Sequence, residues 1–220
     1  KFLLFLRKLF VNLCSRYIVT PTINAVKQSI LNLNSEIINS DEPKTEFKSV
    51  DQNVLKEELK NPHRNVVRML LKLLAYDNGL QNELLPEKWE IEHILPNKWQ
   101  NSYFPNSSKE EVNEVIEHLG NKIPFEKKLN IKASNGYFEK KKDFYMKSKI
   151  AMVQEFSQFH SKDWKLEQIM ERDIRVSDKI IEIFDSWSAD TNSENESNLT
   201  EEDRKAIELI KSRGLESYLK

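Results

Sequence analysis

Glycine is scarce in this sequence, with four residues among 220. Parallel α/β folds and β-sandwiches place glycine in many turns, so its scarcity favours helices joined by Asn, Asp, Ser and Pro turns. The single cysteine, Cys14, excludes a disulfide framework and a cysteine-based zinc site. Cys14 lies in the apolar run 11–18, which predicts a buried structural thiol and favours a reducing, cytoplasmic setting.

The N-terminus lacks a hydrophobic run long enough to cross a membrane. Its apolar residues 2–6 are followed by Arg7 and Lys8, well short of the roughly 18 residues that a span needs. The spacing of the apolar residues predicts a helix with a core face instead. That face comprises Leu3, Leu6, Phe10, Leu13 and Tyr17. The chain begins with Lys rather than Met, so we expect a fragment that lacks an upstream domain.

Neither sign of charge dominates the chain, which has a formal net charge of −1. The overall charge therefore does not suggest nucleic acid, and any basic footprint must be local. Residues 121–149 carry one, with nine lysines against three acidic residues. Alone, such a run is more often a solvated helix face than a phosphate track. Residues 185–203 hold seven acids and no Lys or Arg, which is typical of a solvated linker.

Apolar spacing predicts a mainly α protein, with helices over residues 2–19 and 22–39 at its start. The pattern changes at about 86–149, where two short extended segments, 88–93 and 121–125, bracket a polar loop and a helix. We therefore expect four regions: a helical region (1–84), a central region (85–149), flanking helices (150–188), and an acidic linker with a terminal helix (189–220).

One set of residues departs from helix-bundle patterns. Neighbouring residues on a strand point to opposite sides, so His93 can face a reacting phosphate while Glu92 bends into a metal site. Asn130 can supply a second ligand to the metal from a helix that packs behind the strands. Glu and Asn are hard oxygen donors, suited to Mg²⁺ or Mn²⁺ rather than zinc. The full set is Ile91-Glu92-His93-Ile94-Leu95-Pro96, then Gly120-Asn121, then Leu129-Asn130.

These residues, with Ser134-Asn135, Phe138 and Lys141 downstream, resemble the HNH (ββα-metal) nuclease domain of the DUF1524 family. That domain is the C-terminal part of GmrSD-type modification-dependent restriction and phage-defence proteins. The resemblance covers roughly residues 1–188 and is tightest in 88–147. It implies a mainly α, helical domain with an embedded ββα-metal element, whose nuclease core is residues 85–149.

The resemblance also implies a function: a metal-dependent DNA endonuclease that uses one Mg²⁺ or Mn²⁺ ion and leaves 5′-phosphate and 3′-hydroxyl ends. The family's usual N-terminal ParB-like domain is absent from this sequence. That domain or a partner subunit is therefore the expected source of any specificity for modified bases.

Positions in the motif imply individual roles. His93 matches the general base that activates water, and Glu92 matches the acidic metal ligand before it. Asn121 matches the asparagine that braces the hairpin loop and helps to orient the histidine. Asn130 matches the metal ligand on the helix.

The DNA-contacting residues follow from the same comparison. Lys141 matches the lysine of the F-x-x-K element, where a phosphate contact is expected. Its neighbours Lys140 and Lys142, together with Asn135, are assigned to the same DNA-binding surface. Beside a metal site, the lysine-rich stretch becomes a phosphate track, since neutralised phosphates dominate affinity for DNA.

Two departures from the family keep an alternative open. Lys122 follows Gly-Asn where an apolar residue is usual, and Pro124 removes a donor from the second strand. These features favour a non-catalytic helical module that has a degenerate HNH element and binds DNA or a partner. Alone, Gly120-Asn121 also fits a helix C-cap, and Asn130 and Asn135 fit helix caps. Trp99 and Tyr103, in the long loop, are candidates for base stacking.

Overall fold

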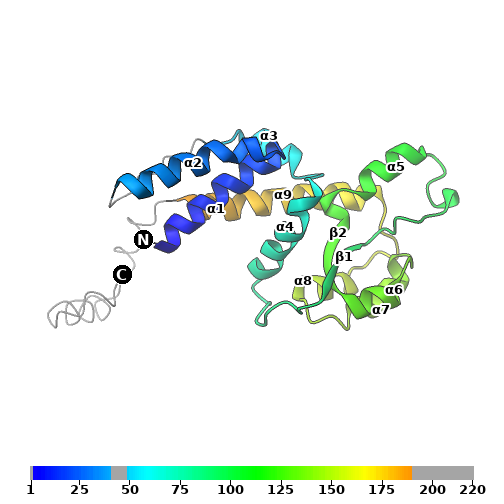
Figure 1. Ribbon diagram of the computed structural model, residues 1–220. Coiled ribbons are helices and arrows are strands. Elements are labelled where there is room, and N and C mark those ends of the chain that lie inside the picture. The colour runs from blue at the N-terminus through cyan, green and yellow to red at the C-terminus, as the bar shows by residue number, and fades with distance from the viewer. Residues whose placement is uncertain (1, 41–48, 190–220) are drawn as a thin grey trace, which may run out of the picture.

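The computed structural model describes residues 2–40 and 49–189 and confirms a mainly α protein with a small two-stranded sheet (Figure 1). The predicted linker and terminal helix lie outside these residues, apart from Ala189. No helix in the described part is both long and apolar enough to span a membrane. The helices are α1 (Phe2–Val19), α2 (Ile23–Asn39), α3 (Gln52–Glu58), α4 (Arg64–Asp77), α5 (Lys109–Ile116), α6 (Lys127–Ala133), α7 (Phe138–Tyr145), α8 (Ala151–Ser157) and α9 (Leu166–Ser188).

Helix α9 is the central helix of the described structure. It contacts α1, α3, α4, α5 and the short 3₁₀ turn η2 (Leu119–Asn121), which precedes the second strand (Figure 1). Its apolar residues recur at helical spacing, so one stripe of the helix is buried. That stripe includes Ile169, Val176, Ile180, Ile183 and Phe184.

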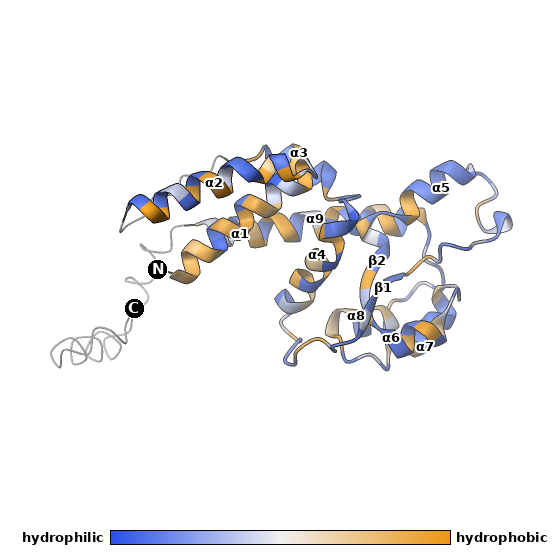
Figure 2. Cartoon of the chain, in the orientation of Figure 1, coloured by the Kyte–Doolittle hydropathy of each residue, from blue (hydrophilic) through white to orange (hydrophobic). Residues whose placement is uncertain are grey.

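The predicted core face of the first helix is only partly correct. Phe10 and Tyr17 pack against the core, but Leu3 is 60% exposed and Leu6 is 40% exposed. Figure 2 shows this hydrophobic N-terminal end of α1 lying away from the body of the protein. Helix α1 reaches the core from Phe10 onwards, and its buried apolar residues are the predicted Cys14 and Ile18. Burial raises the pKa of the Cys14 thiol to about 12.

The central region contains the predicted hairpin and helix. Strand β1 (Trp89–His93) pairs antiparallel with β2 (Lys122–Glu126), so that Glu92 lies opposite Ile123 and His93 opposite Lys122. Helix α6 follows β2 directly and contacts both strands. Pro124 fits into this sheet without ending β2, because each strand of a two-stranded sheet has a free edge.

Gly120 allows η2 to approach α9 closely. A Cβ atom at this position would lie 2.3 Å from the Ile169 carbonyl oxygen and 2.9 Å from the Asp173 backbone nitrogen. The Gly120 N–H also donates to Asp173 Oδ1 at 2.6 Å. The glycine therefore fixes the start of β2 against the central helix.

Replacing Gly120 with alanine is expected to lower the free energy of unfolding by about 3 kcal/mol, because backbone atoms of α9 cannot move aside cheaply. Gly79→Ala is the matched control, since a Cβ there meets nothing within 4 Å. Urea denaturation of both variants measures the difference. Equal midpoints for the two variants would contradict this explanation of Gly120.

Candidate active site

A polar pocket of about 230 Å³ opens where β1 ends, between the strand and helices α6 and α7. We call it the motif pocket. It brings together five of the predicted site residues: Glu92, His93, Asn130, Asn135 and Lys141. The other lining residues are Ile91, Pro96, Asn97 and Ser134. Asn121, Lys140 and Lys142 are not part of its lining.

Glu92 is almost fully buried, at 4% exposure, at the inner side of the motif pocket. Its Oε1 lies 2.7 Å from Lys141 Nζ and accepts a hydrogen bond from the Tyr145 hydroxyl at 3.1 Å. Oε2 takes part in neither contact. Burial raises the pKa of Glu92 and lowers that of Lys141, and the attraction between the two groups opposes both shifts.

Lys141, for which a phosphate contact was predicted, does not lie on an exposed basic face. The side chain is 1% exposed, and besides Glu92 its Nζ donates to the carbonyls of His93 (2.6 Å) and Ile94 (3.2 Å). It therefore ties α7 to the end of β1. A buried ammonium group needs such partners.

The ammonium group of Lys142 also forms hydrogen bonds within the protein. Its Nζ donates to the carbonyls of Phe159 and Ser161, each at 2.6 Å, and its side chain is 16% exposed. Of the three consecutive lysines, only Lys140 is exposed. The helical period explains the difference, because successive residues of α7 point to different sides.

His93 lies at the last position of β1, with its side chain 20% exposed. Its Nε2 is buried and has no hydrogen-bond partner of good geometry among the described residues, although Glu117 Oε2 lies 3.5 Å away. With Nε2 buried, Nδ1 is the ring nitrogen left for a proton transfer in the motif pocket, which His93 lines. Burial lowers the pKa of His93, which favours the neutral imidazole that a general base requires.

Asn121 is fully buried and holds the loop that follows β1. Its Oδ1 accepts a hydrogen bond from the Leu95 N–H at 2.8 Å, and its Nδ2 donates to the carbonyls of Leu95 (3.0 Å) and Ile116 (2.9 Å). Gly120-Asn121 does not cap α5, whose C-cap is Glu117. Asn121 therefore holds the loop after β1 in place and does not line the motif pocket.

Replacing Asn121 with alanine is expected to cost about 3 kcal/mol of unfolding free energy, because three buried backbone groups lose their partners. Asn113→Ala is a matched control, since that asparagine is exposed and accepts one bond, from Trp99. Thermal denaturation of the two variants measures the contrast. A cost for Asn121→Ala no larger than the control's would contradict the bracing role.

The end of α6 supplies the opposite wall of the motif pocket. Asn130 lies within α6, so it caps neither end. The helix ends at Ser134, which has a positive φ of 50° that non-glycine residues rarely adopt. This turn sets both Ser134 and Asn135 beside the pocket, Asn135 being exposed.

The aromatic side chains of the long loop are used in packing. Tyr103 stacks on Tyr137, with ring centroids 4.4 Å apart, and Lys165 Nζ lies 5.2 Å from the Tyr103 ring. Trp99 meets Phe104 edge to face and donates from Nε1 to Asn113. These contacts do not favour Trp99 or Tyr103 as stacking platforms for bases.

Three residues near the site were not predicted: Glu117, which lies beside His93, Lys122, which pairs with Glu117, and Tyr145, which bonds Glu92. Tyr145 follows Lys141 by four residues, and this helical spacing is a signal that could have placed it with Lys141. Glu117 has no such signal, because a loop and the strand pairing bring it to His93.

The donor set of the motif pocket fits a hard divalent ion. Glu92 and Asn130, which line this pocket, carry a carboxylate and an amide group, and both groups contain hard oxygen donors. Within the described residues, no group of three His, Cys, Asp or Glu side chains could form a closed metal cage. Mg²⁺ commonly binds through one or two carboxylates and keeps water and substrate phosphate as its other ligands.

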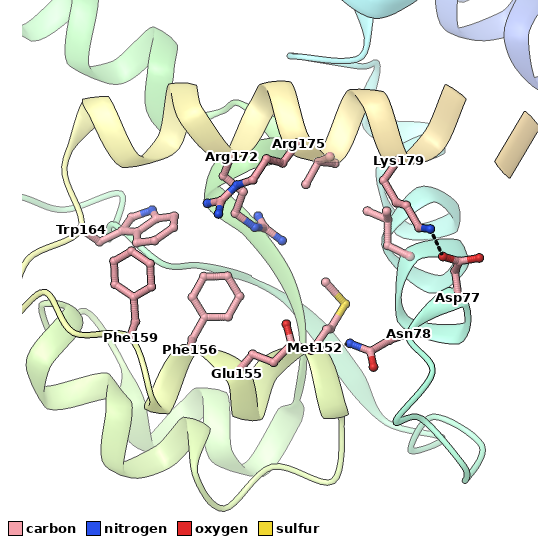
Figure 3. A pocket seen from close by; sticks show the side chains of 12 residues that line it. Asp77, Asn78, Met152, Glu155, Phe156, Phe159, Trp164, Arg172, Arg175 and Lys179 are labelled. Atoms are coloured by element: carbon pink, nitrogen blue, oxygen red, sulfur yellow. Dashed lines mark hydrogen bonds and ion pairs between the residues drawn. The ribbon is translucent and has the colours of Figure 1, made fainter. Parts of the chain in front are cut away.

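A second and larger pocket, of about 380 Å³, lies between α4, α8 and α9 (Figure 3). It shares no lining residue with the motif pocket. Several of its polar groups pair across it: Lys179 with Asp77 at 3.0 Å, and Asn78 with Glu155 at 2.6 Å. These pairs join α4 to α8 and α9, which is a packing role.

A protein-family model matches the chain. No curated protein and no solved structure matches the chain. The family model for the C-terminal domain of GmrSD restriction endonucleases matches residues 44–177, which include the hairpin, α6, α7 and the whole motif pocket. By this match over more than half of its length, the chain belongs to the family of GmrSD restriction endonuclease C-terminal domains.

Proposed function

We propose that this chain is a metal-dependent DNA endonuclease and forms the nuclease part of a cytoplasmic restriction and phage-defence protein. The proposal rests on one observation: His93, Glu92 and Asn130 all line the motif pocket, which lies within a ββα element. An imidazole can act as the general base and hard oxygen donors can hold a divalent ion, and the two together suffice for hydrolysis of a phosphodiester.

In the proposed reaction, Nδ1 of His93 takes a proton from a water molecule in the motif pocket. The water oxygen forms a bond to the phosphorus as the bond from phosphorus to the 3′ oxygen breaks, and that oxygen takes a proton from solvent. Glu92 and Asn130 would hold one Mg²⁺ or Mn²⁺ ion, which supplies charge stabilisation at the phosphate. Asn121 and Lys141 keep the backbone around His93 in place.

DNA is the proposed substrate, with Lys140 and Asn135 as exposed contacts at the edge of the site. Lys132, exposed on α6, extends the same lysine-rich stretch. In this proposal Lys141 and Lys142 do not contact DNA directly, because their ammonium groups already bond to protein atoms. Discrimination of modified bases is assigned to an N-terminal ParB-like domain or a partner subunit.

Changing Lys132 and Lys140 together to glutamate is expected to weaken DNA binding for all sequences. Each lost phosphate contact lowers the slope of log affinity against log salt by about 0.9, so the slope should fall by about 2. The control is Lys27→Glu with Lys72→Glu, the same charge change on α2 and α4. Fluorescence anisotropy over a salt series measures both. Equal slopes for the two double variants would show that these lysines are only a solvated face.

Nicking of supercoiled plasmid tests the function itself. Wild-type protein with Mn²⁺ or Mg²⁺ is expected to nick or linearise the plasmid, and EDTA is expected to stop the reaction. Binding without cleavage at every metal concentration would instead support the non-catalytic module. The two departures that favoured that module do not deform the site, because Pro124 stays paired opposite Ile91 and Lys122 pairs with Glu117.

A further inference from the structure

His93 has a carboxylate behind it that the nuclease motif does not include. Glu117, the C-cap of α5, places Oε2 3.5 Å from the buried Nε2 of His93, and the Glu117 side chain itself is half exposed. A buried ring nitrogen without a partner is costly, and this carboxylate oxygen is an acceptor within reach of a small side-chain movement.

Lys122 holds Glu117 in that place. Its Nζ lies 2.9 Å from Glu117 Oε2 and also donates to the Glu117 backbone carbonyl. Lys122 is itself buried, at 7% exposure, and it lies opposite His93 in the hairpin. The carboxylate is therefore held by a lysine on one side and faces the imidazole on the other.

The backbone of His93 is fixed separately. Lys141 donates to the His93 carbonyl at 2.6 Å, which holds the end of the strand but does not select the orientation or tautomer of the ring. Only a group at a ring nitrogen can do that, because the tautomer of a neutral imidazole is set by the hydrogen bond that its other nitrogen makes.

We infer that Glu117, tethered by Lys122, is a positioning residue that keeps the proton of His93 on Nε2 and leaves the Nδ1 lone pair free towards the motif pocket. This inference rests on the proposed function, in which Nδ1 takes the proton from water. It also gives Lys122 a role: the residue that departs from the family pattern at this position belongs to a pair that orients the base.

The experiment that separates this role from mere packing is a measurement of the His93 tautomer. We would record ¹⁵N spectra of the imidazole rings in the metal-free full chain, with His93→Gln to assign the signal. Wild type should show one tautomer, protonated at Nε2. Glu117→Ala should show a mixture, because Nε2 then loses the acceptor that favours its proton.

Kinetics supply the second measurement. Glu117→Ala should lower kcat roughly 10–100-fold, the usual effect of removing a group that orients a histidine, with little change in KM. Glu117→Gln, which keeps an acceptor oxygen, should recover part of the loss. Lys122→Met should shift the tautomer in the same direction but less. Glu114→Ala, an exposed position on α5, is the matched control and should change neither quantity.

The outcomes distinguish the two proposals. If Glu117→Ala leaves both the tautomer and kcat as in wild type, the inference is overturned even though the enzyme cleaves DNA. If wild type does not cleave DNA at all, the proposed function fails, and the tautomer measurement still decides whether Glu117 orients His93.

Discussion

Cleavage by His93→Ala is expected to fall by roughly 10²–10⁴ relative to wild type, the range typical of losing a general base. The ring is half-buried at the end of β1 and lines the motif pocket, and the burial of Nε2 leaves Nδ1 for the proton transfer. The variant keeps Glu92 and Asn130, so the loss should appear in kcat under saturating metal. Single-turnover cleavage of a labelled duplex measures it.

His160→Ala is the control for this prediction, because His160 is exposed and lies outside the motif pocket. It should cleave DNA as wild type does. Cleavage by His93→Ala within about threefold of wild type would contradict the general-base role, provided that circular dichroism shows both variants folded.

The largest expected effect on stability is at Lys141. Lys141→Met leaves the Glu92 carboxylate buried without its cation and removes the donor from the carbonyls of His93 and Ile94. Breaking a buried pair by removing one partner typically costs 3–5 kcal/mol, so we expect a loss of about 4 kcal/mol in unfolding free energy. Urea denaturation measures this loss.

Two further variants identify the cause of that loss. Lys140→Met, next to Lys141 but exposed, should change stability by no more than about 0.5 kcal/mol. Adding Glu92→Gln to Lys141→Met removes the unpaired charge and should restore at least about 1 kcal/mol. If Lys141→Met is as stable as Lys140→Met, the buried pair does not hold α7 against β1.

The sequence was most informative where local pattern and local structure coincide. Apolar spacing predicted α1 and α2 closely, and the extended segment ending at His93 became β1. The motif residues Glu92, His93 and Asn130 were also predicted to lie together, and the structure brings them to one pocket. Their chemical roles stay predictions.

What the sequence could not predict depends on contacts between distant segments. Three adjacent lysines look alike in a sequence, yet packing buries Lys141 against Glu92 and leaves Lys140 in solvent. The exposed start of α1 has the same cause. The spacing of apolar residues predicts a helix, but it does not tell whether another element covers Leu3, and none of the described elements does. Glu117 reaches His93 only through the register of the hairpin and the path of η2.

Titration of Mn²⁺ by calorimetry into wild type, His93→Ala and Glu92→Ala tests the central claim most directly, because it separates the base from the metal ligand. We predict that His93→Ala binds Mn²⁺ as wild type does while losing cleavage. Glu92→Ala is predicted to lose most of its metal affinity and to regain part of its activity at high Mn²⁺, since a carboxylate is the stronger donor to a hard cation. Loss of metal binding in His93→Ala, with binding intact in Glu92→Ala, would contradict the account and make His93 a ligand instead of the base.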